Sequence, residues 1–182
     1  MYIDQKGEIL GRYRKRNLCS LNDFFCQEYL TPSKDAHQVF DTKHFRAGML
    51  LCWDLAWPEA FRDLMKQGAE VIVVPAFWKL EDLGDIGKKH DPHGLTERRM
   101  IESMVMSRAL ENECCVVFVN CGGKKSDGYL GGSSVAMPLK GSVIRFDDPT
   151  ERLEVVEIDL DVLEDARSLY KIREDYNSRF KE

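Results

Sequence analysis

The sequence lacks several features that would each point to a broad class of function. No apolar run approaches the roughly 18 residues that a membrane-spanning helix requires, and the N-terminus has no signal-peptide core. None of the six cysteines forms a C-x-x-C pair, and no Cys/His grouping has zinc-finger spacing. The formal charge of −5 lacks the basic excess of proteins that bind nucleic acids or anionic membranes. We therefore expect a cytoplasmic protein without a metal, an organic cofactor, a nucleic-acid partner or a membrane partner.

The composition is that of a globular protein. The chain has 182 residues, of which 43% are hydrophobic, and these numbers suit one packed domain rather than a disordered chain. We find no internal repeat and no linker. The sequence therefore predicts a single domain over residues 1–182.

The order of apolar segments predicts an α/β domain with mixed strands. A hairpin is expected over residues 2–17, around the turn at Lys6-Gly7. Strands are expected at 39–41, 46–53, 70–75, 115–120, 134–137, 142–146 and 153–160. Helices are expected from Pro58 to Gly68, from about 96 to 112 and from Asp161 onward, with a polar loop from 79 to 94.

A cysteine stands where a predicted strand gives way to a helix, in the stretch GMLLCWDLAWPE. In α/β sheets, ligands tend to bind outside the carboxyl ends of the strands. A thiol at such a bend is flanked by unpaired backbone N–H groups, such as that of Trp53, which could bind an oxyanion. Cys52 is therefore a candidate nucleophile. The alternative is that it fills core space beside Leu50 and Leu51.

A lysine in the N-terminal hairpin is a second candidate. Strand alternation places Lys15 on the same face as Ile9 and Tyr13, and Arg14 on the opposite face. An inward ammonium needs a partner, and a nearby lysine lowers the pKa of a thiol. We therefore expect Cys52 to be the most acidic of the six thiols. The alternative is a lysine that lies along the sheet edge with its ammonium in water.

Two motifs resemble those of one known family. GEILGRYRK, which ends at Lys15, resembles the lysine motif of the nitrilase (carbon–nitrogen hydrolase) superfamily, and GMLLCWDLAWPEAFR resembles its nucleophile motif. Further matching segments follow in family order: Pro75 to Trp78, Arg108 to Asn112, Asn120, Gly132 to Gly141, Asp159-Leu160 and Arg173 to Asp175.

The resemblance implies a fold, a partner state and a chemistry. The fold would be a nitrilase-like αββα sandwich with mixed sheets, assembled into homo-oligomers. Cys52 would attack the carbon of a small amide or nitrile, and Lys15 would stabilise the charge of the tetrahedral intermediate. The substrate pocket would be lined by Trp53, Phe77, Trp78 and Asn120. The three aromatic residues could equally be core packing.

The sequence also departs from the family pattern. The family's triad includes a glutamate upstream of the lysine motif, and nothing before Lys15 resembles it. We therefore expect an N-terminally truncated chain that corresponds to the C-terminal two-thirds of the family domain, with impaired hydrolysis. Glu28, in the loop after the lysine motif, is the nearest match to a second family glutamate, or else an ordinary solvated carboxylate. Glu28 and Glu111 are the carboxylates that could replace the missing base.

Three functions stay open at this point. The first is a carbon–nitrogen hydrolase, and the second is a non-catalytic relative that acts as an interaction subunit. The third is a Cys–His protease or transferase. The four histidines (His37, His44, His90 and His93) have no local signature of such an enzyme.

Overall fold

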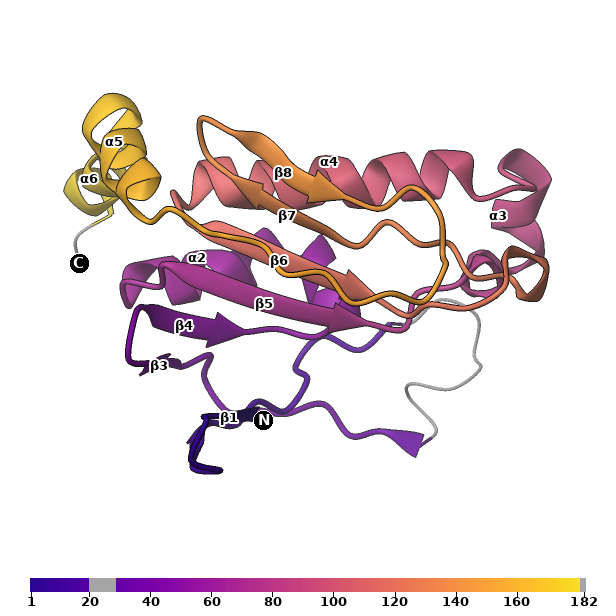
Figure 1. Cartoon of the computed structure of the whole chain (residues 1–182), viewed down its shortest axis with the longest axis horizontal. Coiled ribbons are helices and arrows are strands. Elements are labelled where there is room, and N and C mark those ends of the chain that lie inside the picture. Colours follow the sequence, from indigo (N-terminus) through magenta and orange to yellow (C-terminus); the bar gives the residue numbers. More distant parts are fainter. Residues whose placement is uncertain (20–28, 181–182) are drawn as a thin grey trace.

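The computed structural model describes residues 1–19 and 29–180, and a mixed six-stranded sheet forms its centre (Figure 1). The strands follow one another across the sheet in chain order. The three middle strands β4, β5 and β6 are parallel, and the other neighbouring pairs are antiparallel. The strands are β3 (Val39–Asp41), β4 (Arg46–Met49), β5 (Val71–Ala76), β6 (Cys115–Asn120), β7 (Ser134–Met137) and β8 (Gly141–Arg145). Six of the expected strands are therefore confirmed, with shifts of a few residues at their ends.

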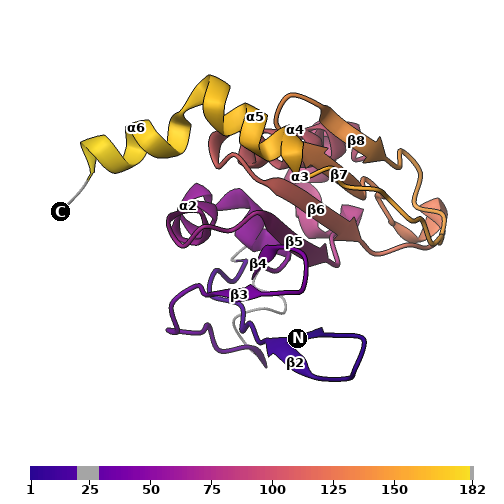
Figure 2. The same cartoon turned by 60° about the vertical axis from the view of Figure 1, so that its left-hand side comes forward.

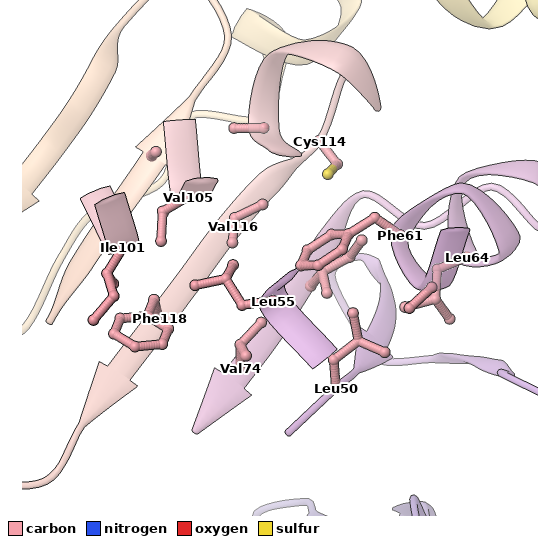
Figure 3. Packing of buried hydrophobic residues seen from close by; sticks show 14 of the residues in the cluster. Leu50, Leu55, Phe61, Leu64, Val74, Ile101, Val105, Cys114, Val116 and Phe118 are labelled. Atoms are coloured by element: carbon pink, nitrogen blue, oxygen red, sulfur yellow. The ribbon is translucent and has the colours of Figure 1, made fainter. Parts of the chain in front are cut away.

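Two helices cover one face of this sheet. Helix α2 (Pro58–Lys66) connects β4 to β5, and helix α4 (Leu95–Glu111) precedes β6. Proline occupies the first turn of α2, as predicted, and Phe61, Leu64 and Met65 form its buried stripe. Phe61, Val74 and Phe118 are three of the fully buried side chains that meet between the helices and the sheet (Figure 3). This layer is the main hydrophobic core.

The opposite face is covered by the C-terminal part of the chain. Residues 146–160 form an extended segment, here called the strap, which runs along the sheet to α5 (Asp161–Tyr170) and α6 (Ile172–Arg179) (Figure 1). Both helices lie at one end of the molecule, and α6 leads away from the sheet (Figure 2). Val156, Ile158 and Leu160 of the strap pack on the second hydrophobic cluster.

The prediction of a strand at residues 153–160 is wrong. Within the strap, residues 153–160 have no ladder hydrogen bonds, so they are extended without being part of a sheet. Leu153 and Val155 point into solvent, with 91% and 89% of their surface exposed. An alternating apolar pattern makes an extended conformation favourable, but a strand also needs a neighbouring strand to bond with.

The expected hairpin is confirmed, although its strands are short. β1 (Tyr2–Ile3) pairs antiparallel with β2 (Ile9–Gly11). The turn uses Gly7 at a φ of 83°, a conformation that glycine adopts without strain. The hairpin packs on β3 through Tyr2 and Phe40, whose ring centroids are 5.0 Å apart. Gly11 is required at this contact, because a β-carbon there would lie 2.5 Å from the Phe40 ring.

The loop expected from 79 to 94 is partly helical. A short 3-10 helix, η2 (Leu80–Leu83), leads into α3 (Gly84–His90). The Asp82 carboxylate accepts a hydrogen bond of 2.8 Å from the backbone N–H of Lys79, which closes the first turn. No helix among residues 1–19 and 29–180 is long and apolar enough to cross a membrane.

Candidate active site

The turn after β4 places a thiol at the carboxyl edge of the sheet. The ladder to β5 ends with a hydrogen bond from the Leu50 N–H to the Val73 carbonyl (3.0 Å), and the 3-10 helix η1 (Cys52–Ala56) begins two residues later. Cys52 has a φ of 51°, which is strained for a residue with a β-carbon. Such a strained strand-to-helix turn is typical of an exposed nucleophile. The bend predicted from the sequence is therefore present.

Two opposing effects determine the acidity of this thiol. Burial and the nearby Asp82 carboxylate raise the pKa of Cys52, and the Lys15 ammonium together with backbone hydrogen bonds from Phe77 and Trp53 lowers it. Burial outweighs the others, so the pKa of Cys52 is raised overall. Lys15 therefore lowers the pKa of Cys52 as expected, but its effect is smaller than that of burial, and the rank of Cys52 among the six thiols stays a prediction. The thiol is neutral at neutral pH and needs a proton acceptor before it can attack a carbonyl group.

The fold brings Lys15 to Cys52 from a distant part of the sequence. β2 ends at Gly11, so residues 12–17 are not part of a strand, but the predicted alternation persists in exposure from Arg12 to Lys15 and is lost at Arg16, which is half-buried. Lys15 is half-buried, whereas Arg14 is exposed and pairs with Asp35 at 2.6 Å. The Lys15 carbonyl accepts a hydrogen bond of 2.9 Å from the Ser33 N–H. The Lys15 charge therefore lies close enough to act on the thiol, and Arg14 faces solvent.

The aromatic candidates differ in their surroundings. Trp78 is 2% exposed and donates a hydrogen bond from its indole nitrogen to the Glu97 carboxylate (3.0 Å). Trp53 is half-buried, and its ring centroid lies 5.3 Å from that of Trp78. Phe77 is 64% exposed and meets the edge of Tyr129. Trp78 is therefore part of the core behind the site, whereas Phe77 and Trp53 have surface that a ligand could contact.

Asn120 uses its whole side chain for internal hydrogen bonds. Its amide oxygen accepts from the backbone N–H groups of Trp78 (2.9 Å) and Cys121 (3.0 Å). Its amide nitrogen donates to the carbonyls of Trp78 and Gly131, both at 2.9 Å. An asparagine can make about four such bonds, so Asn120 holds the end of β5 in place rather than offering a free group to a substrate.

The other candidates lie elsewhere. Glu28 is outside the described residues. Glu111 ends α4, at the edge of the sheet where β6 begins, and pairs with Arg108 at 2.9 Å. Because β4 and β6 are parallel, that edge is opposite to the one that carries Cys52. His37 is buried against Asp63, with 3.0 Å between the ring nitrogen and the carboxylate. Within the described ranges, no three His, Cys, Asp or Glu side chains are grouped so that they could hold a metal ion.

One buried carboxylate near the site was missed at the sequence level. Asp54 is completely buried and accepts hydrogen bonds from Tyr13, Asn17 and Leu51. Its signal was available, because Asp54 is the only charged residue between Arg46 and Glu59. A charge in such an apolar stretch must find partners if it becomes buried. The sequence could not tell which residues those partners are.

Comparison with known proteins agrees with this geometry. The family model for carbon-nitrogen hydrolases matches residues 1–168. The chain is 29% identical to an N-carbamoylputrescine amidase of Arabidopsis thaliana, over 95% of this chain and 58% of that protein. It is also 29% identical to a 2-oxoglutaramate amidase of Bacillus subtilis (strain 168), over 96% of this chain and 61% of that protein. The chain thus spans about three-fifths of the length of these relatives.

A solved structure shows the same fold. The carbon-nitrogen hydrolase of Helicobacter pylori G27 superimposes with a TM-score of 0.80 at 25% sequence identity. The match covers 99% of this chain and 64% of that one. The nitrilase-like α/β fold with mixed sheets that the motifs predicted is therefore confirmed.

Proposed function

The chain belongs to the carbon–nitrogen hydrolase family, and on this basis we propose that Cys52 is the nucleophile for hydrolysis of a non-peptide C–N bond in a small amide. The observation that carries the proposal is the strained turn at Cys52, supported by the electrostatic effect of Lys15 on its thiol. The two relatives named above are amidases, which favours an amide over a nitrile as the substrate.

The proposed reaction has two steps. The Cys52 sulfur bonds to the carbonyl carbon, and its proton passes to a base and then to the leaving nitrogen as the C–N bond breaks. Ammonia or an amine departs, and a thioester with Cys52 is left. Water then adds to the thioester carbon, the C–S bond breaks, and the thiol regains a proton as the carboxylic acid is released.

Two groups would stabilise the negative charge that develops on the carbonyl oxygen. The Trp53 backbone N–H lies at the start of η1, next to the sulfur, and the Lys15 ammonium approaches from the hairpin segment. Groups held in place before the reaction stabilise such charge without a reorganisation cost. Trp53 and Phe77 would supply the surface that the substrate contacts.

We assign the role of general base to none of the described residues. The resemblance assigns this role to a glutamate upstream of the lysine motif, and nothing before Lys15 resembles the motif that carries it. The raised pKa of Cys52 makes a base more necessary, since both deprotonation of the thiol and activation of water depend on it. We therefore propose that the 182-residue chain has low turnover by itself, and that adding a segment with this glutamate increases it. A base contributes about 10²–10⁴-fold to such rates.

The covalent step can be tested by intact-mass analysis. The chain is incubated with a panel that includes N-carbamoylputrescine, 2-oxoglutaramate and simple aliphatic amides and nitriles, and the mass shift is mapped to a peptide. We expect an adduct that disappears in Cys52→Ala and persists in Cys121→Ala. Cys121 is a matched control, because it is also a half-buried thiol at the same edge of the sheet. It directly follows β6, which lies two strands away from β4.

The alternative outcome has a clear meaning. If Cys52→Ala still forms the adduct, Cys52 is not the nucleophile for these substrates. The same conclusion follows if no member of the panel modifies Cys52 either in the 182-residue chain or after a segment with the glutamate is added. The non-catalytic interaction subunit then becomes the better account of this chain.

A further inference from the structure

The Asp54 carboxylate lies between the two segments that carry the proposed catalytic residues. One of its oxygens accepts hydrogen bonds from the Tyr13 hydroxyl (2.7 Å) and the Leu51 backbone N–H (2.9 Å). Its other oxygen accepts from the Asn17 backbone N–H (3.1 Å) and the Asn17 side-chain amide (2.9 Å). All four partners are donors, and the Asp54 side chain has no solvent exposure.

The positions of these partners are specific. Tyr13 and Asn17 each lie two residues from Lys15, on either side of it, and Leu51 immediately precedes Cys52. Asp54 itself follows Cys52 by two residues and belongs to the same 3-10 turn. A single carboxylate therefore bonds to residues on both sides of Lys15 and to the residue before Cys52.

Other polar contacts of the lysine segment lead to different parts of the fold: Arg14 pairs with Asp35, and Arg16 lies near His37 and Asp63. β2 ends at Gly11, so residues 12–17 receive no strand ladder from the hairpin. The Ser33 N–H bonds to the Lys15 carbonyl, but it does not tie the segment to the Cys52 turn. From this arrangement we infer that Asp54 is a positioning residue, which clamps the Lys15 segment onto the Cys52 turn and so directs the Lys15 ammonium at the thiol. The inference rests on the roles proposed above for Cys52 and Lys15.

The chemistry of the site explains why a carboxylate is needed. Hydrogen bonds to an ionised carboxylate are roughly twice as strong as bonds between neutral groups. An asparagine at this position would turn an NH₂ group toward donors, and two of the four bonds would be lost. Burial and the hydrogen bond to Asp54 raise the pKa of Tyr13, so its hydroxyl stays protonated and remains a donor at any working pH.

The direction of a pKa change separates this role from a simple charge effect. Asp54→Asn removes a negative charge near Cys52, and by itself this removal would lower the pKa of the thiol. Release of the Lys15 segment would move a positive charge away and raise the pKa of the thiol. The clamp therefore predicts that the pKa of Cys52 rises in Asp54→Asn, whereas a direct charge effect predicts that it falls.

The experiment measures the alkylation rate of Cys52 by iodoacetamide between pH 6 and pH 10, with peptide mapping. An opposite charge at close range typically shifts a pKa by about one unit or more, so we expect Lys15→Ala to slow labelling roughly tenfold near pH 7.5. Asp54→Asn should also raise the midpoint of the pH profile of Cys52 and slow labelling by at least about threefold. The double variant should be no slower than Lys15→Ala alone, because the clamp acts through Lys15.

Glu113→Gln is the matched control for loss of a buried carboxylate. Glu113 is also completely buried and accepts the backbone N–H groups of Ile172 (2.8 Å) and Arg173 (3.2 Å) at the start of α6. It lies before β6, at the edge of the sheet opposite Cys52. This variant should lower the thermal midpoint, as Asp54→Asn does, and leave the pH profile of Cys52 unchanged.

Several results would overturn the clamp. If Lys15→Ala shifts the profile and a folded Asp54→Asn variant keeps it or lowers its midpoint, the clamp is wrong and the Cys52 and Lys15 assignments stand. If Lys15→Ala itself has no effect, the proposed role of Lys15 fails, and the clamp fails with it. If Asp54→Asn does not fold, Tyr13→Phe removes one donor without changing any charge. A parental profile in Tyr13→Phe then overturns the inference, and a raised midpoint supports it.

Discussion

The strain at Cys52 leads to a quantitative prediction about stability. A residue with a β-carbon in the left-handed region costs roughly 1–2 kcal/mol relative to a right-handed conformation. Glycine does not pay this cost, but it loses more freedom on folding and is usually less stable than alanine by about 0.5–1 kcal/mol. At Cys52, whose φ is 51°, the first effect opposes the second.

The comparison is therefore between alanine and glycine at the same position. Cys52→Gly should be at least as stable as Cys52→Ala, and by these figures more stable by about 0.5–1 kcal/mol. At Cys121, a described thiol that is also half-buried and has no left-handed φ, glycine should be the less stable by about 0.5–1 kcal/mol. The difference between the two positions is thus expected to be about 1–2 kcal/mol in favour of glycine at Cys52.

Urea unfolding of the four variants, followed by circular dichroism, would measure this difference. With a slope of about 2 kcal/mol per molar, a 1.5 kcal/mol difference moves the unfolding midpoint by roughly 0.7 M. The comparison is insensitive to the loss of the thiol, because both variants at each position lack it. If glycine costs as much at Cys52 as at Cys121, the backbone there is not strained, and the turn no longer supports a nucleophile.

Three further predictions follow from contacts and burial. Lys15→Ala should slow iodoacetamide labelling of Cys52 at pH 7, whereas Arg14→Ala should not, because Arg14 faces solvent; equal effects would reduce Lys15 to part of a general basic edge. The labelling rate of Cys52 should rise with pH to a midpoint above that of an ordinary thiol, because burial raises its pKa. Burial raises the pKa of Cys114 to about 12, so Cys114 should label far more slowly in the folded protein. Faster labelling of Cys114 than of Cys52 would contradict the burial of Cys114. Phe61→Ala should lower the free energy of unfolding by about 3–5 kcal/mol in urea titrations, and a loss below about 1 kcal/mol would mean that the core layer of Figure 3 is not packed around this ring.

Local sequence was sufficient for most of the elements. The apolar runs of β5 and β6 and the stripe on α2 are periodic patterns, and each can be interpreted without knowledge of the rest of the chain. The bend at Cys52 was predictable for the same reason, since a buried strand followed by a proline-initiated helix requires a turn between them. The lysine motif, the nucleophile motif and the further matching segments, taken in order, were also enough to indicate the family.

Tertiary structure decided the outcomes that depend on a distant partner. Residues 153–160 have the alternating pattern of a strand but no neighbouring strand within the described residues, so they are extended without a ladder. The net pKa of Cys52 depends on how deeply the thiol is buried, and the sequence gives no measure of that depth.

Asp54 illustrates both what the sequence determines and what only the tertiary structure determines. The sequence alone places a carboxylate in an apolar stretch, and elementary chemistry requires that it find donors if it is buried. Its partners Tyr13 and Asn17 lie 41 and 37 residues away along the chain. Only the packing of the hairpin segment against the turn after β4 brings these donors to the carboxylate. A contact between such distant residues depends on the whole fold, and no local pattern of residues encodes it.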